Sequence, residues 1–428
     1  MIYAFILGTN HSLCKVEILN VLTNKGIDIS VLESSQEGLI LETNVEIEKK
    51  ISIDSFGSTA KIVKILSVVD LKDFFENFAQ HVTERNLVDE LILTSKGKHT
   101  LFGLSVYGFG GKFKDLNYGW YIAPSICREI RADLSSYKIK SSFIPLKERK
   151  ISTASIDNNK ILEDGFELVV GIGSKVAYIG KTVAIQDYKS YSFRDYGRPA
   201  RDPHAGMIPP KLAKMMINLS NKDINSKILD PFCGSGTFLE ELALLGYKNI
   251  TGADLEEKAV NDSKTNLAWI FENYNLDRTN FNFNFFRSDV REISGRIKPG
   301  SIDAIITEPY LGSVKARHFS LQQISKEIKE LQELYLNAFN EFNKIVAKDG
   351  KLVIVFPVFR NDNNFYHLEI ISQIKKIGFK PVSYVPEKFQ NQETMSKLAL
   401  ELDPARNTIT YYRPDQTVSR EIFIFTRV

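Results

Sequence analysis

The second half of the chain alternates between strand-like and helix-like patterns of apolar residues. Strand-like runs lie at residues 228–229, 249–253, 281–286, 302–306, 352–356 and 422–425. Helix-like spacing of apolar side chains occurs at residues 212–219, 237–241, 321–346 and 368–377. Strands that alternate with helices predict an α/β fold with a doubly wound, Rossmann-like and mostly parallel sheet.

The first 180 residues show a less regular mixture. Strand-like runs lie at residues 3–7, 38–42, 102–108, 138–145 and 165–170, and helix-like segments at 12–22 and 124–137. This mixture predicts two small α+β units, residues 1–65 and residues 66–180. The polar, aromatic and arginine-rich segment 181–205 is expected to link them to the α/β part at residues 206–428.

The first strand of the α/β part runs into a glycine turn. The turn consists of Asp230, Pro231, Phe232, Cys233, Gly234, Ser235, Gly236 and Thr237. Glycine is needed where a turn requires φ values that a Cβ would penalise, or where a ligand approaches the backbone closely. The N–H groups that open the helix at Thr237 can bind an anion, because they lack partners within the helix. The turn therefore predicts the floor of a ligand site.

The next three strands each end near a carboxylate. Asp254, followed by Leu255, lies about 20 residues beyond the turn, where a doubly wound fold places the acid that holds ribose hydroxyls. Asp289, followed by Val290, and then Glu308 come after the two later strands. One such acid alone is usually a solvated turn residue. Because the carboxyl ends of the strands form the edge where ligands bind, the whole series predicts a nucleoside site.

These motifs resemble those of a known family. The sequence DPFCGSGT at 230–237 resembles the first motif of class I S-adenosylmethionine-dependent methyltransferases, in the variant found in nucleic-acid amino-methylases. The segments RDYGRPARD at 194–202 and GMIPPKLA at 206–213 resemble the entry to the catalytic domain of THUMP-domain tRNA guanosine-N2 methyltransferases. The resemblance covers most of residues 190–428 and is weaker over residues 1–180. It implies S-adenosyl-L-methionine as the cofactor and tRNA as the partner.

The resemblance also implies a domain order. Residues 1–65 would be a ferredoxin-like spacer and residues 66–180 a THUMP-like RNA-binding domain. Residues 181–205 would be a linker, and residues 206–428 the class I methyltransferase domain.

Within that domain the resemblance assigns roles by position. The turn and the start of the helix would hold the methionine carboxylate of the cofactor, Asp254 the ribose hydroxyls, and Asp289 with Val290 the adenine. The residues expected to bind the cofactor are Asp230, Pro231, Phe232, Gly234, Ser235, Gly236, Thr237, Asp254, Leu255, Asp289, Val290 and Glu308. No metal ligand is expected among them.

The catalytic motif departs from the family pattern. The guanosine-N2 enzymes carry Asp-Pro-Pro-Tyr-Gly after this strand, whereas this chain has TEPYLG at 307–312. The ungapped register places Glu308 on the aspartate and is preferred because both flanks agree; a shifted register would place Thr307 there. An amine conjugated with a purine ring is a poor nucleophile, so an acceptor must orient it. We expect Glu308 and the carbonyl of Pro309 to do so, with Tyr310 stacking on a flipped base.

The overall charge does not decide whether the chain binds RNA. The net charge is +3, so phosphate binding would depend on local clusters of basic residues. One such cluster comprises Lys138, Lys140, Lys147, Arg149 and Lys150. The linker adds aromatic and basic residues that could stack on bases or bind phosphates, namely Tyr188, Tyr191, Phe193, Arg194, Tyr196, Arg198 and Arg201. A solvated charged face and a pinned linker are the alternatives.

Composition predicts a cytoplasmic protein. At 428 residues, with 43% apolar and 25% charged residues, the chain has the usage of an ordinary multidomain globular protein. The isolated cysteines Cys14, Cys127 and Cys233 favour a reducing compartment and argue against structural zinc. The apolar start is too short for a signal sequence, and no run is long enough to span a membrane.

The sequence leaves several alternatives open. The departed motif is compatible with an amino-methylase of adenine or of ribosomal RNA, as well as with a guanosine-N2 enzyme. An RNA-binding protein that keeps the cofactor pocket without activity is a further possibility. Whether the chain needs a small activator subunit or forms a homodimer cannot be decided from these residues.

Overall fold

The computed structural model describes residues 1–93, 99–201, 207–313, 319–361, 364–412 and 418–428. Contacts divide the chain into two compact units. The first unit comprises Met1–Tyr188 with Glu387–Leu400, and the second comprises Lys189–Pro386 with Glu401–Val428. The second unit holds the predicted ligand edge, and the first holds both predicted α+β parts.

Among the described residues, the first unit is built on an eight-stranded sheet. Its strands are β1 (Ile2–Leu7), β2 (Ile29–Ser34), β3 (Gly38–Thr43), β4 (Thr59–Asp70), β5 (His99–Gly108), β6 (Lys140–Phe143), β7 (Gly165–Ile172) and β8 (Val176–Ile185). They lie in the order β2-β3-β1-β4-β8-β7-β5-β6. Strand β4 pairs with β1 on one side and with β8 on the other. The expected boundary at residue 65 therefore falls inside a strand that joins both parts.

Helices of the first unit cover this sheet. They are α1 (His11–Asn24), α2 (Ile47–Lys50), η1 (Ile53–Ser55), α3 (Leu71–Val82), α4 (Arg85–Ile92), α5 (Phe113–Ser136), α6 (Thr153–Asn158), α7 (Ile161–Asp164), η5 (Glu387–Phe389) and α14 (Gln392–Leu398). Apolar residues of α3, α4 and α5 pack on β5 and β7 to form one core.

The predicted start of the long helix is wrong. A helix was expected from Pro124, but α5 begins at Phe113 and carries Pro124 in its interior. Proline is favoured at a helix start because it lacks an N–H group, and it usually weakens a helix interior. Here Ile122, Ile126 and Ile130 are buried at helical spacing, and their packing holds the helix together across the proline.

A segment from late in the chain completes the first unit. Lys15 of α1 is 1% exposed, and its Nζ donates to the carbonyl of Leu398 at 2.7 Å. Ser34 of β2 donates to the carbonyl of Lys397 at 2.8 Å. Residues 387–400 were expected to lie in the methyltransferase domain, but these contacts assign them to the first unit. We call residues 387–400 the strap.

In the described residues, the second unit contains a nine-stranded sheet. Its strands are β9 (Lys227–Asp230), β10 (Asn249–Asp254), β11 (Asn282–Arg287), β12 (Ile302–Thr307), β13 (Val346–Asn361), β14 (Asn364–Tyr366), β15 (Phe379–Pro381), β16 (Ile409–Tyr411) and β17 (Val418–Arg427). The main path is β11-β10-β9-β12-β13-β17-β15. Strands β9 to β13 pair in parallel, whereas β17 is antiparallel to β13. The predicted mostly parallel sheet is confirmed.

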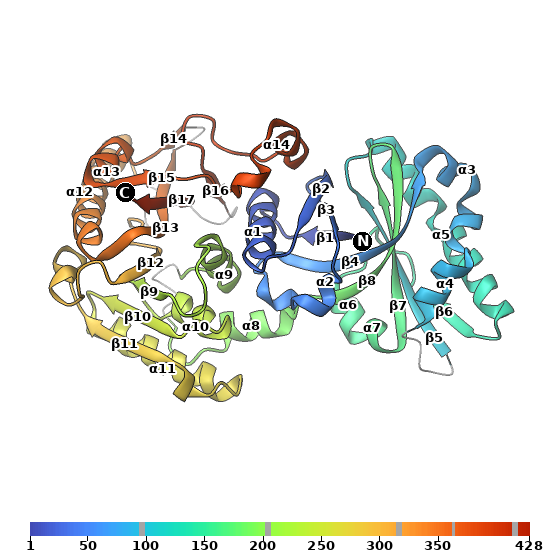
Figure 1. Ribbon diagram of the computed structural model, residues 1–428, viewed down its shortest axis with the longest axis horizontal. Coiled ribbons are helices and arrows are strands. Elements are labelled where there is room, and N and C mark those ends of the chain that lie inside the picture. Colours follow the sequence, from blue (N-terminus) through green and yellow to red (C-terminus); the bar gives the residue numbers. More distant parts are fainter. Residues whose placement is uncertain (94–98, 202–206, 314–318, 362–363, 413–417) are drawn as a thin grey trace. The chain divides into compact units, whose positions relative to one another are not determined.

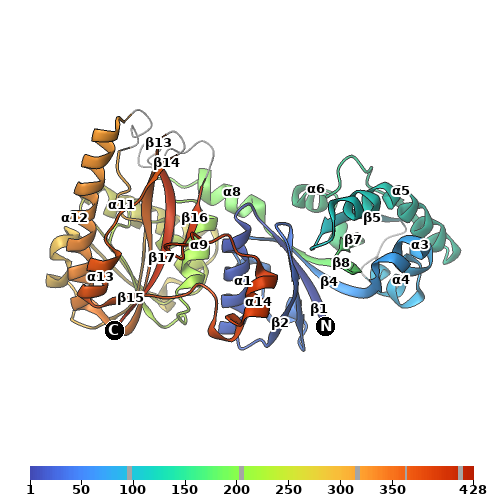
Figure 2. The same ribbon diagram turned by 90° about the horizontal axis from the view of Figure 1, so that it is seen from above.

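Helices lie on both faces of this sheet, as a doubly wound fold requires. They are α8 (Tyr188–Tyr196), α9 (Pro210–Leu219), α10 (Thr237–Leu244), α11 (Glu257–Asn273), η2 (Arg278–Asn280), η3 (Val290–Gly295), α12 (Leu321–Ile345) and α13 (Ile371–Ile377). Helix α10 packs between α9 and α11, and α12 packs on α13 and η3. Figures 1 and 2 show α12 and α13 on one side of the sheet and α9 on the other.

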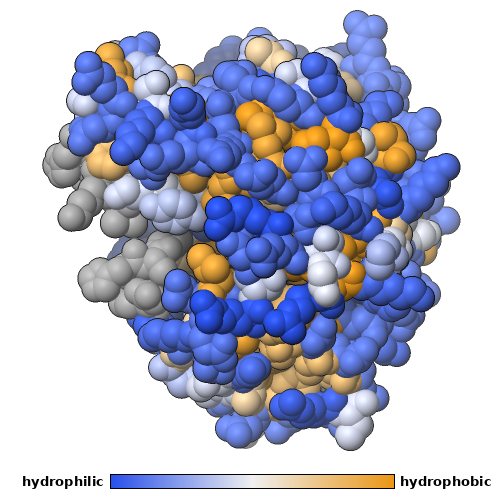
Figure 3. All heavy atoms as spheres, turned by 90° about the vertical axis from the view of Figure 1, so that its left-hand side faces the viewer, coloured by the Kyte–Doolittle hydropathy of each residue, from blue (hydrophilic) through white to orange (hydrophobic). Residues whose placement is uncertain are grey.

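The outer face of the second unit is polar. Figure 3 shows mostly hydrophilic side chains there, with hydrophobic side chains visible in patches between them. The core beneath is formed by apolar residues of β12, β13, β17 and α12. In the described part of the chain, no helix combines the length and the apolar character needed to cross a membrane.

Candidate functional site

The glycine turn follows β9 in the second unit and needs both of its glycines. Gly234 has φ +51° and Gly236 has φ +95°, values that other residues rarely adopt. A Cβ on Gly236 would lie 3.1 Å from the Cα of Ser263, so α11 approaches the turn closely and a side chain there would be crowded. A Cβ on Gly234 would meet nothing within 4 Å. The turn is therefore packed on one side and open on the other.

Hydrogen bonds tie this turn to the neighbouring strand β10. The Cys233 N–H donates to the carbonyl of Ala253 at 2.9 Å, and the Gly234 N–H donates to Oδ2 of Asp254 at 2.9 Å. Oδ1 of Asp254 accepts from the N–H of Glu256 at 3.0 Å. The structure thus brings together the glycine turn and the first acid of the series, which the sequence placed about 20 residues apart.

Two buried residues of α11 hold the turn from behind. Ser263 donates to the carbonyl of Gly234 at 2.8 Å. Asn266 donates to the carbonyls of Ser235 and Ala200, each at 2.8 Å, and its side-chain oxygen accepts from the N–H of Ala200 at 2.9 Å. Sequence reasoning missed both residues, because a polar residue in a helix gives no sign of burial.

A buried arginine from the segment after α8, Arg198, contacts the start of α10. Nη1 of Arg198 donates to Oγ1 of Thr237 at 2.7 Å and lies 3.4 Å from Oε1 of Glu240. Its Nε and Nη2 are buried and have no hydrogen-bond partner among the described residues. Burial raises the pKa of Glu240 to about 8, and the charge of Arg198 offsets this only in part. A buried guanidinium therefore lies beside the first residue of α10.

Two of the linker arginines, Arg194 and Arg198, are buried and form contacts within the second unit. Nε of Arg194 donates to Oε1 of Glu241 at 2.6 Å, and Lys214 of α9 lies 3.3 Å from the other oxygen. Arg194 and Arg198 are each 3% exposed, and Tyr191 is also buried. Of the residues predicted to contact RNA here, Arg194 and Arg198 instead pin α8 and the segment after it to α10. The ring of Tyr191 packs under Arg194 and two lysines of α9. Phe193, Tyr196 and Arg201 remain exposed.

The first residue of the glycine motif is a buried carboxyl. Asp230 is 1% exposed and accepts from Oγ1 of Thr307 at 2.6 Å and from the Phe232 N–H at 3.2 Å. Burial raises its pKa to about 7; these hydrogen bonds oppose the shift, and the charges of Asp254 and Glu308 add to it. Asp230 thus links β9 to the end of β12. Thr307, considered above only as an alternative catalytic position, serves as its partner.

Glu308, the predicted catalytic carboxylate, is held by an arginine that the sequence gave no reason to expect. Nε of Arg420 donates to Oε2 at 2.5 Å and Nη2 donates to Oε1 at 2.9 Å. The Glu308 side chain is 11% exposed and that of Arg420 is 3% exposed. Glu308 therefore sits at the end of β12 with its carboxylate fixed by a two-point ion pair.

The next two residues of the TEPYLG motif differ in exposure. Pro309 is buried, whereas Tyr310 is 57% exposed. The hydroxyl of Tyr335, in α12, donates to the carbonyl of Tyr310 at 3.3 Å and so anchors the backbone of this loop. An exposed ring on an anchored backbone is available for stacking.

The two remaining predicted cofactor positions differ in their surroundings. Asp289 accepts from Nε of Arg291 at 3.0 Å and caps η3 through the Arg291 N–H at 2.9 Å. Hydrogen bonds from the Arg291 guanidinium hold the pKa of Asp289 below its usual value. Val290 is 5% exposed and belongs to the core, whereas Leu255 is 51% exposed.

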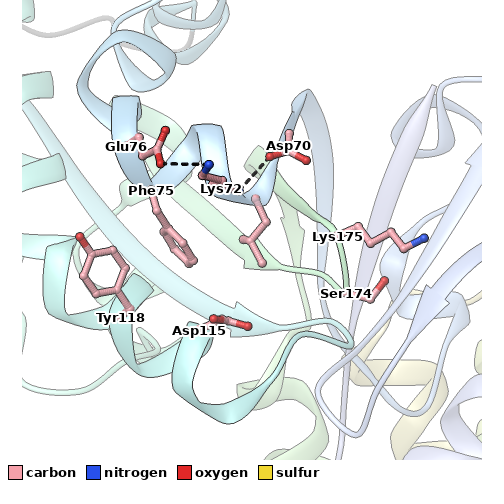
Figure 4. Close-up of a pocket in the computed structure, with 9 residues that line it drawn as sticks. Asp70, Lys72, Phe75, Glu76, Asp115, Tyr118, Ser174 and Lys175 are labelled. Atoms are coloured by element: carbon pink, nitrogen blue, oxygen red, sulfur yellow. Dashed lines mark hydrogen bonds and ion pairs between the residues drawn. The ribbon is translucent and has the colours of Figure 1, made fainter.

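The first unit contains two hollows with different linings. One, of about 580 Å³, lies beside α3 and α5, where Phe75 and Tyr118 face each other (Figure 4). Its charged lining residues have both signs, including Asp70, Glu76 and Lys72. This hollow contains none of the predicted site residues.

The second hollow, of about 530 Å³, is basic. Its lining includes His99, Arg128, Arg131 and Lys140, with no acidic residue among the lining residues that the structure describes. We call it the basic hollow. Sequence reasoning found Lys140 but missed the two arginines, which lie three residues apart on α5 with Glu129 between them in the sequence.

Two residues of the predicted basic cluster are already paired. Nη2 of Arg149 and Nζ of Lys150 each lie 2.8 Å from Oε1 of Glu37. Burial alone would raise the pKa of Glu37, but hydrogen bonds from these two residues outweigh it and hold the pKa below its usual value. The charges of Arg149 and Lys150 are therefore partly neutralised by Glu37.

Comparison with protein families identifies methyltransferase sequence patterns in the chain. Residues 198–382 match the family described as RMKL-like, methyltransferase domain. Residues 104–265 match the family described as DNA methylase, a match that extends into both units. The first match contains the glycine turn, Asp254, Asp289 and Glu308.

Curated relatives resemble part of the chain. The tRNA (guanine(10)-N2)-dimethyltransferase of Methanothermobacter thermautotrophicus is 37% identical over 162 residues, which are 37% of this chain and 42% of that protein. That of Methanocaldococcus jannaschii is 28% identical over 172 residues, 40% of this chain and 48% of that protein. The chain thus spans less than half the length of these two relatives in the matched regions.

Among solved structures, the crystal structure of TrmN from Thermus thermophilus is similar over the whole chain. It covers 100% of both chains with a TM-score of 0.54 and 13% sequence identity. At this identity the likeness concerns the fold alone. The second unit accordingly has a Rossmann-like methyltransferase fold, preceded by an additional α+β unit.

Proposed function

We propose that this protein is an S-adenosyl-L-methionine-dependent methyltransferase that modifies the exocyclic N2 amine of a guanosine in tRNA. One observation carries the proposal above the others. The open glycine turn is hydrogen-bonded to Asp254, and the fixed carboxylate of Glu308 ends β12, on the other side of β9 in the same sheet. The proposed nucleoside site and the proposed acceptor for the amine thus lie at the same edge of the sheet, where these strands end.

The residues around the turn fit the proposed cofactor. The space beside Gly234 is open, so the backbone can serve as the floor for a ligand. Arg198 adds buried positive charge at the start of α10, where unpaired N–H groups favour a carboxylate. When bound, S-adenosyl-L-methionine supplies an electrophilic methyl group. Asp254 would hold its ribose hydroxyls, and Asp289 with Val290 would lie near its adenine.

The chain's own residues would prepare the acceptor base. Glu308 and the carbonyl of Pro309 would accept hydrogen bonds from the amine, orient its lone pair and stabilise the positive charge that develops on nitrogen. Tyr310, exposed on an anchored loop, would stack on a base flipped out of its helix. Flipping costs a few kcal/mol, which such stacking would partly return.

The first unit would bind the RNA through phosphates. The basic hollow presents Arg128, Arg131 and Lys140 without a competing carboxylate in its lining. Such a surface can displace counterions from the phosphate backbone. A THUMP-like role for the first unit and a cytoplasmic location, where tRNA is modified, are part of this proposal.

The direct test measures transfer of labelled methyl groups to unmodified tRNA, followed by nuclease digestion and mass analysis. We expect N2-methylguanosine or its dimethyl form, and loss of the signal in Glu308→Ala. Label on adenosine, or on ribosomal RNA only, would select an amino-methylase of another target. Cofactor and tRNA binding without transfer to any RNA would contradict the proposed activity.

A further inference from the structure

The partner of Glu308 lies two strands away. In the sheet order β12-β13-β17, strand β13 lies between the strand that ends at Thr307 and the strand that carries Arg420. Neighbouring strands are about 4.8 Å apart, so β12 and β17 are separated by roughly 10 Å. Arg420 also lies further along the sheet, since it is opposite Pro357 whereas Thr307 is opposite Ile354. Arg420 nevertheless reaches both oxygens of Glu308, at 2.5 Å and 2.9 Å. Two long side chains are needed to close this distance.

We propose that Arg420 is a positioning residue that fixes the carboxylate of Glu308 as a stationary acceptor for the target amine. This inference rests on the proposed function. It also gives a reason for the departure from the family motif. An aspartate at position 308 would be one methylene shorter, so its carboxylate would reach less far toward the guanidinium across β13.

The ion pair leaves Glu308 with acceptor capacity. A carboxylate has about four lone-pair sites on its two oxygens, and the two-point contact uses one site on each. The remaining sites can accept an N–H of a base. Because a guanidinium already shares the negative charge, Glu308 acts by orienting the amine and stabilising the charge on it, rather than by removing its proton early.

Arg420 is also held where it is. It is 2% exposed as a whole residue, and its backbone pairs with Pro357 of β13 and Tyr411 of β16. Burial by itself would lower the pKa of Arg420, but the Glu308 carboxylate outweighs this and raises it. Breaking a buried ion pair by moving one partner costs several kcal/mol. The contact therefore persists while a base enters, and the base adapts to it.

The neighbouring residue provides a matched control. Glu421 is next to Arg420 on β17 and forms an equivalent two-point ion pair with Arg406, at 2.7 Å and 3.1 Å. Glu421 is fully buried, as its pair requires. Arg406→Met therefore removes the same kind of contact from the same strand without touching Glu308.

The experiment compares Arg420→Met, Arg420→Lys and Arg406→Met in the full chain, with labelled cofactor and unmodified tRNA. We expect Arg420→Met to lower kcat by about 100-fold while KM for tRNA and the cofactor Kd change by about twofold or less. Arg420→Lys keeps the charge but loses the two-point contact, so its kcat should be intermediate. Arg406→Met should lower the melting temperature and leave kcat within about twofold of the parent.

A double-mutant cycle separates positioning from mere stability. Glu308→Asp should lower kcat in the parent protein and have little further effect in Arg420→Lys, because both changes break the same contact. Independent, multiplicative losses would overturn the positioning role, as would equal kcat in Arg420→Met and Arg406→Met. If the parent transfers no methyl group to any RNA, the proposed function itself fails, and the positioning role fails with it.

Discussion

Gly234 and Gly236 lie two residues apart in one turn and have different surroundings. Both have positive φ, but only Gly236 lies against a neighbouring helix: a Cβ at this position would be 3.1 Å from the Cα of Ser263. Glycine is thus needed for close packing at position 236, whereas at position 234 it leaves the space beside the turn open. Asp230 adds a second case, because its carboxyl is buried beside two other acids.

Replacing each glycine by alanine should therefore have different effects. Gly236→Ala combines backbone strain with a clash against a helix backbone, and should lower the free energy of unfolding by about 2–4 kcal/mol. Gly234→Ala bears the strain alone, about 1 kcal/mol, but places a methyl group in the open space. It should weaken cofactor binding at least about tenfold while the protein stays folded.

Chemical denaturation and calorimetry with S-adenosyl-L-methionine measure these two effects separately. Equal loss of stability in both variants would contradict the assignment of Gly236 to packing. Unchanged cofactor affinity in Gly234→Ala would contradict the placement of the cofactor on this turn.

Asp230 should make stability fall with rising pH. Its pKa is raised from 3.8 to about 7 in the folded protein, so the folded state holds the proton more tightly than the unfolded state. The resulting stabilisation is fully present below about pH 4 and is lost as the pH rises through about 7. Asp230→Asn keeps an acceptor for Thr307 and removes the titration.

Denaturation curves from pH 5 to pH 8 check this prediction. The parent protein should lose on the order of a few kcal/mol over this range relative to Asp230→Asn. Asp289→Asn is a control that should leave the slope over this range unchanged, because the pKa of Asp289 is lowered below 3.8 and its contribution is lost only at lower pH. Identical pH slopes in the parent and Asp230→Asn would refute the prediction.

At the scale of elements, α5 shows how packing and surface function share one helix. Ile122, Ile126 and Ile130 face the core, while Arg128 and Arg131 line the basic hollow on another side. The helix continues through Pro124 because its apolar face is buried on the sheet. A helical register thus fixes the two arginines about one turn apart, at a spacing that suits neighbouring phosphates.

Charge reversal in the basic hollow should weaken tRNA binding. Arg128→Glu with Arg131→Glu should raise the Kd for tRNA by about 100-fold at moderate salt and reduce the slope of log K against log salt by about 2. Lys326→Glu with Lys329→Glu, at exposed positions of α12, makes the same change of net charge elsewhere and should change Kd by about threefold or less. Equal effects of both pairs would show that only overall charge matters.

At the scale of the whole molecule, the chain crosses between the two units at residues 188–189, 386–387 and 400–401. The strap, residues 387–400, leaves the second unit, packs on α1 and β2, and returns. Lys15 is the buried contact that holds it, since its ammonium group meets the Leu398 carbonyl at 2.7 Å. A buried cation without such a partner would be costly.

Removing this contact should loosen the strap. Among the described residues, Lys15→Met leaves the Leu398 carbonyl with only the 3.1 Å contact from the Ser34 hydroxyl. It should lower the free energy of unfolding of the first unit by about 1–3 kcal/mol. Limited proteolysis should then cleave residues 387–400 faster than in the parent. Lys25→Met, an exposed change at the end of the same helix, should have neither effect. Equal cleavage rates in the two variants would exclude a role for Lys15.

Local sequence patterns were enough to predict most elements of the second unit and the sheet edge at which they meet. Apolar periodicity predicted β9, β10, β11, β12 and α12, and the order of a doubly wound fold brought the glycine turn next to Asp254. These features depend on local pattern and on chain connectivity, which the sequence displays directly. The roles of Asp289 and Tyr310 remain predictions.

The partners of the polar residues became known from the folded arrangement of the chain. Glu308 and Arg420 are 112 positions apart and meet because β13 and β17 follow β12 in the sheet. In the sequence, Arg194 and Arg198 lie in a polar linker and were candidates for RNA contacts, yet they are buried against Glu241 and Glu240, respectively. The identity of a charged residue does not reveal whether its side chain faces water or a buried carboxylate. That depends on the strand order and on the packing of segments that are distant in the sequence.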